Sequence, residues 1–85
     1  MYYVTMTDKF FSGWGCAQGK ICKRVMKCET YEQAEHVAEH GRNEAGCIYV
    51  NICMNKPRYD SRRYFVREYD YNEDLGGKWK LPQDR

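Results

Sequence analysis

Hydrophobic and polar residues alternate along four parts of the chain, and each part predicts a β-strand. In residues 2–7, both the even-numbered and the odd-numbered positions are rich in residue types that favour strands. Residues 20–28 alternate less regularly, which indicates a bulge within that strand. The clearest alternation runs over residues 48–54 and predicts a central strand, and residues 62–69 predict a fourth strand.

One helix is expected between the second and third strands, from Thr30 to about Arg42. Thr30 and Gln33 have the spacing of a capping box, in which each side chain accepts a hydrogen bond from the backbone N–H of the other. Small and apolar residues then recur at helical spacing as far as Gly41, so one side of the helix is expected to face a sheet.

The resulting order, β-β-α-β-β, predicts a two-layer α+β fold. We expect two hairpins that form an antiparallel four-stranded sheet, with the helix packed on one face. Residues 55–61 include Pro57 and are expected to form the loop of the second hairpin. Residues 1–69 are predicted to be a single domain, and residues 70–85 a tail that is either flexible or folded back through Trp79 and Leu81.

Composition agrees with a small globular protein, since 42% of the 85 residues are hydrophobic and 31% are charged. The apolar runs are too short to span a membrane, and the N-terminal residues lack the layout of a signal peptide, so a cytoplasmic location is expected. The five cysteines are an odd number without an export signal, which favours reduced thiols over disulfides.

Charge is distributed unevenly along the chain. Between Thr30 and Gly46 four glutamates accompany one arginine, Arg42. The strand regions instead carry a set of basic residues: Lys20, Lys23, Arg24, Lys27, Arg62, Arg63 and Arg67. An acidic helix and a basic sheet are therefore expected, and this separation is the main indication of function.

The sheet face away from the helix is the candidate binding surface. Counting alternate residues along the strands predicts that it carries Tyr3, Lys23, Lys27, Tyr49, Asn51, Arg63, Phe65 and Arg67. Aromatic rings among cations suit single-stranded nucleic acid, because bases stack on rings and cations neutralise phosphates. They equally suit a polar protein partner, and they also occur on ordinary outer sheet faces.

The loop after the first strand carries further aromatic residues, including Phe11 and Trp14. Two roles remain open for them, a cover over an open edge of the core or an exposed contact with a partner.

No catalytic residue, cofactor or metal site is expected. The stretch Ser12–Gly15 lacks the lysine and helix of a phosphate-binding loop. His36 and His40 lie four residues apart on the helix, but the cysteines show none of the closely spaced pairs that structural zinc uses. Both histidines are therefore expected to be solvated.

Four stretches of sequence, residues 2–10, 12–15, 49–53 and 55–59, together resemble a family of small proteins carried by bacteriophages and other mobile elements. The resemblance spans most of residues 1–67 and transfers no catalytic residue to this chain. The β-β-α-β-β order also resembles some anti-CRISPR proteins, which are small phage-encoded inhibitors of host surveillance complexes.

These resemblances imply a non-enzymatic inhibitor in the cytoplasm of a bacterial host. Its partner would be a protein or ribonucleoprotein complex that handles nucleic acid, and its oligomeric state is left open. The alternative is a module that binds single-stranded DNA or RNA directly through the same sheet face.

Overall fold

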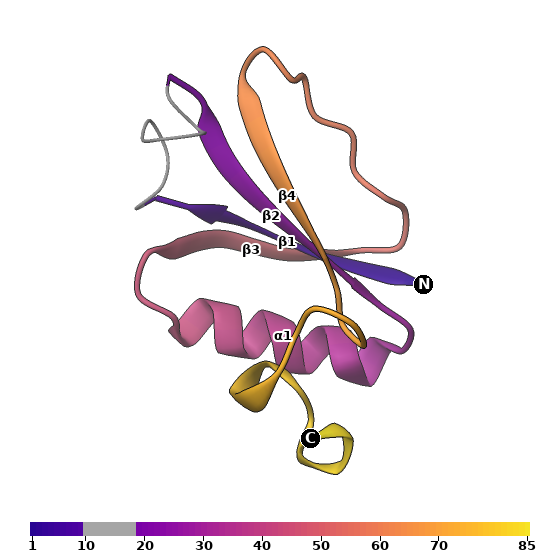
Figure 1. Ribbon diagram of the computed structural model, residues 1–85. Coiled ribbons are helices and arrows are strands. Elements are labelled where there is room, and N and C mark those ends of the chain that lie inside the picture. Colours follow the sequence, from indigo (N-terminus) through magenta and orange to yellow (C-terminus); the bar gives the residue numbers. More distant parts are fainter. Residues whose placement is uncertain (10–18) are drawn as a thin grey trace.

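The computed structural model describes residues 1–9 and 19–85 (Figure 1). Its helix and strands are β1 (Tyr2–Asp8), β2 (Ile21–Cys28), α1 (Tyr31–Asn43), β3 (Cys47–Cys53) and β4 (Tyr64–Asp70). Two short 3-10 helices, η2 (Gly77–Trp79) and η3 (Pro82–Asp84), complete the chain. Among the described residues, no helix has the length and apolar character needed to cross a membrane.

The four strands form one mixed sheet in the order β3-β1-β2-β4. β1 pairs antiparallel with both β2 and β3, whereas β4 pairs parallel with β2. The predicted α+β fold with one helix and four strands is confirmed, but the fully antiparallel sheet is wrong. β3 is an edge strand and not a central one, and it forms no hairpin with β4, because residues 54–63 carry the chain from one edge of the sheet to the other.

Helix α1 covers one face of the sheet with small side chains. The capping box is present, since the Thr30 hydroxyl accepts from the Gln33 N–H and the Gln33 side chain accepts from the Thr30 N–H. At Gly41 the helix approaches β1 so closely that a Cβ atom would lie 2.7 Å from the Met6 methyl carbon. The buried core between helix and sheet consists mainly of Val4, Met6, Met26, Cys28, Ala34, Val37 and Ala38.

The irregular alternation of β2 reflects burial of both its faces. β2 pairs with β1 without interruption from Lys23 to Cys28, so it contains no bulge against that neighbour. On the helix side Arg24 forms an ion pair of 2.6 Å with Asp8, whose side chain is almost completely buried. On the other side Val25 is also buried.

The bulge lies in β3 instead. The register between β1 and β3 shifts between Thr5 and Thr7 of β1. Tyr49 is the extra residue in β3, with a positive φ of 54°. A bulge changes the side to which the following residues point. As a result Ile48 and Val50, which the sequence pattern placed on one face, lie on opposite sides of the strand.

Residues 54–63, called the crossing segment below, pass over the sheet face opposite α1 (Figure 1). Tyr59 in this segment contacts Thr5 and Lys23, whose side chains point away from the helix. Thr5 and Thr7 are buried on that face, so the sheet has a cover on both sides.

The C-terminal segment folds back on the helix side of the molecule (yellow in Figure 1). Tyr71 is fully buried, and its hydroxyl donates to Asp84 at 2.6 Å and accepts from the Leu81 N–H at 2.9 Å. The Trp79 ring lies edge-on to His40 at 4.3 Å.

Candidate binding surface opposite the helix

Tyr59 holds the crossing segment against the sheet. Its hydroxyl shares a hydrogen bond with Thr5, and its ring lies 5.2 Å from the ring of Tyr64. Burial raises the pKa of Tyr59 above its ordinary value, so the phenol is protonated at neutral pH. A polar anchor therefore joins the middle of the segment to the centre of the sheet.

Lys23 is a second part of the same anchor. Its ammonium donates to the Thr7 hydroxyl at 2.7 Å and lies 5.7 Å from the Tyr59 ring and 5.9 Å from the Tyr49 ring. Burial lowers the pKa of Lys23, because a desolvated ammonium is less stable than a hydrated one. Lys23 thus lies beneath the two tyrosine rings, and Tyr49 remains 71% exposed.

The crossing segment is rich in cations that face solvent. It contains four basic residues and one acid, and all four basic residues are exposed: Lys56, Arg58, Arg62 and Arg63. We call these four, together with Lys27 and Tyr49, the basic layer. The helix on the other side of the sheet carries Glu32, Glu35 and Glu39 against Arg42, so the expected acidic helix is present. Two of the expected basic sheet residues, Arg24 and Arg67, lie on the helix side.

A turn around Asp60 fixes the backbone of two of these basic residues, Arg62 and Arg63. The Asp60 carboxylate accepts from the Arg62 N–H at 2.9 Å, and its carbonyl accepts from the N–H groups of Arg63 and Tyr64. The Arg63 carbonyl in turn accepts from the Ile21 N–H at the start of β2. The backbone of Arg62 and Arg63 is therefore tied to the sheet while their side chains point into solvent.

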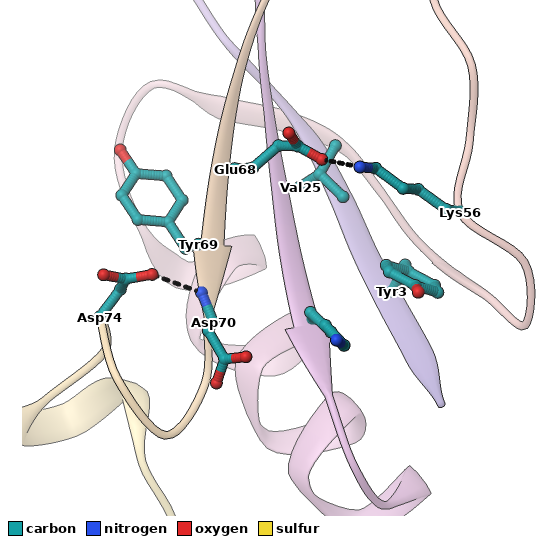
Figure 2. A pocket seen from close by; sticks show the side chains of 8 residues that line it. Tyr3, Val25, Lys56, Glu68, Tyr69, Asp70 and Asp74 are labelled. Atoms are coloured by element: carbon teal, nitrogen blue, oxygen red, sulfur yellow. Dashed lines mark hydrogen bonds and ion pairs between the residues drawn. The ribbon is translucent and has the colours of Figure 1, made fainter.

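Figure 2 shows a pocket of about 290 Å³ beside the other end of the crossing segment. Tyr3 and Val25 line it, and Lys56 bridges it through an ion pair of 2.5 Å with Glu68 of β4. The hydrogen bond to Glu68 raises the pKa of Lys56. Asp70 and Asp74 also line this pocket, so the surface has mixed charge here and is most basic near Arg62 and Arg63.

The sheet brings together five of the eight residues predicted to bind a partner. Tyr3, Lys23, Lys27, Tyr49 and Asn51 lie on the face opposite α1. Arg63 lies just before β4, in the turn described above.

Phe65 and Arg67 lie on the helix side of the sheet, and their predicted position on the binding face is wrong. The register pairs Lys23 with Val66, which therefore shares the face of Lys23, so its two neighbours in β4 point the other way. Arg67 lines a hollow of about 250 Å³ beside Trp79. The sequence pattern assigned Tyr64 and Val66 to the helix side because they are apolar, but the crossing segment half-buries them on the opposite face.

Arg58, Tyr59, Arg62 and Tyr64 were not expected on this surface. Residues 55–61 were expected to form a hairpin loop, and Arg62 and Tyr64 were assigned to the fourth strand, with Tyr64 facing the core. Two signals were available. The stretch is longer than a usual hairpin loop, and four of the eight residues from Lys56 to Arg63 are basic. The proposed contacts of Phe11 and Trp14 lie outside the described residues.

The cysteine thiols in the core are poor nucleophiles. Burial raises the pKa of Cys22, Cys28 and Cys47, for Cys28 to about 12, and a thiol must lose its proton to react. Over residues 1–9 and 19–85, no three side chains of His, Cys, Asp or Glu are grouped in a way that could hold a metal ion.

The two helix histidines are half-buried, and the prediction that they are solvated is wrong. His36 Nε2 lies 2.9 Å from the Lys78 carbonyl oxygen and donates to it, and His40 packs on Trp79. Both contacts attach the C-terminal segment to α1.

Comparison of the chain with known protein families, with curated proteins and with solved structures gave no match.

Proposed function

We propose that this chain is a non-enzymatic binding protein of a phage or other mobile element. It inhibits a nucleic-acid-handling defence complex of the bacterial host, an inhibition of the anti-CRISPR type, and attaches to that complex through the basic layer. The resemblance of residues 1–67 to small phage proteins supports the partner class, and the surface chemistry supports binding as the mode of action.

The observation that carries this proposal is the pair of exposed arginines held by the Asp60 turn. Arg62 and Arg63 have fixed backbones, and both side chains are exposed at the end of the crossing segment, which passes over the face opposite α1. A surface with one sign of charge attracts an oppositely charged partner and also orients it during approach. The contacted part of the host complex must therefore be negative, either nucleic acid held by the complex or an acidic protein surface.

Phage plaque formation on a host with an active CRISPR defence tests the proposal. Expression of the chain should restore plaques, and the Arg62→Glu, Arg63→Glu double variant should not. The matched control, Glu32→Lys with Glu44→Lys, reverses two charges on the opposite layer and should restore plaques like the unmodified chain. Failure to restore plaques against any tested CRISPR type would contradict the proposal.

A second function, direct binding of single-stranded DNA or RNA, is favoured by the exposed ring of Tyr49. This ring lies above Lys23 and can stack on a base while neighbouring cations contact phosphates. Titration with a labelled oligonucleotide should then give an affinity that falls as salt rises, and Tyr49→Ala should weaken it by about 1–3 kcal/mol. No binding at low salt would exclude this function and leave the inhibitor proposal intact.

A further inference from the structure

Exposed apolar side chains gather around the outer edge of β3. Of the six large apolar residues that are most exposed among the described residues, four lie on β3, directly after it, or beside it on α1: Tyr31, Ile48, Tyr49 and Met54. Ile48 and Tyr49 flank the edge from the face opposite α1, and Tyr31 flanks it from the helix. Exposed apolar side chains grouped in this way on a small protein usually mark an interaction site.

A groove runs along this edge between α1 and β3. Tyr31, Glu35, Glu39 and Arg42 follow one another along a single side of the helix, and Ile52 of β3 forms the opposite wall. The volume of the groove is about 280 Å³. Two carboxylates accompany one guanidinium, so the groove is acidic in its middle, with Tyr31 at one end, Arg42 at the other and the apolar Ile52 as its wall.

The backbone of β3 is open along the same edge. Within the described ranges, β3 has β1 on one side and no strand on the other. The bulge at Tyr49 interrupts the first half of the strand. There the side-chain amide of Asn51 donates a hydrogen bond to the Tyr49 carbonyl. The regular half, residues 50–53, lies next to the groove and offers unpaired backbone groups.

We infer that this edge binds an extended segment of a partner protein, which adds to β3 as a further strand. Every second side chain of such a segment points to the helix side of the sheet. A lysine or arginine at that position can lay its apolar stem on Tyr31 and Ile52 and place its charge beside Glu35 and Glu39. The ligand is therefore an extended peptide with alternating basic residues, and the groove that holds them shares no residue with the basic layer.

A second copy of this chain fits the edge less well. In a two-fold pairing of β3 with β3, the same side of α1 from both copies would meet. Glu35 and Glu39 of one copy would then approach the same glutamates of the other, and like charges at an interface are costly.

In the test, a capped octapeptide in which valine alternates with lysine is titrated into the full chain. Binding is monitored by the backbone amide NMR shifts of the chain. We expect saturable shifts in residues 50–53 and along the groove side of α1. Three comparisons should each weaken binding by about tenfold or more: glutamate in place of the peptide lysines, N-methylation of alternate peptide amides, and the Glu35→Lys, Glu39→Lys double variant. Glu32→Lys, a control on another side of the same helix, should bind normally.

Several outcomes would overturn the inference. Shifts confined to the basic layer, or no shift at millimolar peptide, would show that the edge is not a peptide site. Undiminished binding of the N-methylated peptide would exclude strand addition. Sedimentation that shows a dimer, with no dissociation on addition of the peptide, would assign the edge to a second copy of the chain.

Discussion

The two faces of this sheet are covered in different ways. Helix α1 covers one face with Ala34, Val37 and Ala38, which are fully buried against apolar residues of β1 and β2. The crossing segment covers the other face through Tyr59, which bonds to the Thr5 hydroxyl and packs on Lys23 of β2. Most other side chains of the crossing segment point into solvent.

This difference separates stability from binding. Buried apolar area on the helix side supplies most of the folding free energy, because burial of aliphatic side chains is the dominant favourable contribution. The crossing segment buries little and instead presents arginines on a backbone fixed by the Asp60 turn. Mutations on the helix side should therefore reduce stability, whereas mutations of the exposed residues of the crossing segment should reduce binding.

The largest loss of stability is expected for Met6→Ala on the helix side. Met6 is fully buried and packs directly under Gly41, so the substitution leaves a cavity. The free energy of unfolding should fall by about 2–5 kcal/mol, as measured by urea denaturation. If Met6→Ala lowered the free energy of unfolding by less than Tyr59→Ala does, the division of roles between the two faces would be contradicted.

A smaller loss, about 2 kcal/mol, is expected for Tyr59→Ala, because this ring is only half-buried. Hydrogen exchange should accelerate at the Ile21 and Arg63 amides, which anchor the end of the crossing segment, but not in the helix. Tyr59→Phe serves as the control, since it removes only the hydrogen bond to Thr5 and should cost about 1 kcal/mol. Equal exchange in all three proteins would show that Tyr59 does not hold the segment.

Tyr71→Phe should cost about 1 kcal/mol near neutral pH, because it removes the hydrogen bonds to Asp84 and Leu81. Burial and the Asp84 bond raise the pKa of Tyr71 to about 12, above the value of about 10 in an unfolded chain. The stabilisation is present below pH 10 and is lost as the pH rises from 10 to 12, since the unfolded state then releases its proton first.

Denaturation curves between pH 9 and 12 check this point. The unmodified chain should lose stability more steeply than the Tyr71→Phe variant. Cys28, whose pKa is also raised to about 12, acts in the same direction but is present in both proteins. Parallel curves would mean that Tyr71 is not the titrating group.

The helix side of the fold could be predicted from the sequence because its signals are local. The capping box at Thr30 and the helical spacing up to Gly41 depend on residues close in the chain. The course of residues 54–63 could not be predicted in this way, since it depends on which edge of the sheet accepts β4.

The error at Phe65 and Arg67 follows from the same cause. An apolar residue in a strand indicates a buried face but does not say which face is buried, and here Val66 is half-buried on the face opposite α1. The basic character of the surface was predictable from composition. The identity of the cations that supply it was not, because Lys23 proved to be half-buried and Arg24 is paired with Asp8.

The smallest effect on stability is expected for the Arg62→Glu, Arg63→Glu double variant. Both side chains are exposed, so each substitution should change the free energy of unfolding by no more than about 0.5 kcal/mol. Thermal denaturation in physiological salt measures this. A larger loss would show that these arginines support the fold and would weaken their assignment to binding.

Affinity capture from infected host cells tests the division between the two faces most directly. Three baits are compared: the unmodified chain, the Arg62→Glu, Arg63→Glu variant, and the Glu32→Lys, Glu44→Lys variant. We expect the first and third to retain the same partner and the second to lose it by at least about tenfold, because like charges are then pressed together at the interface. Loss of the partner by the helix variant, with retention by the arginine variant, would show that the acidic layer is the binding surface and would contradict the account.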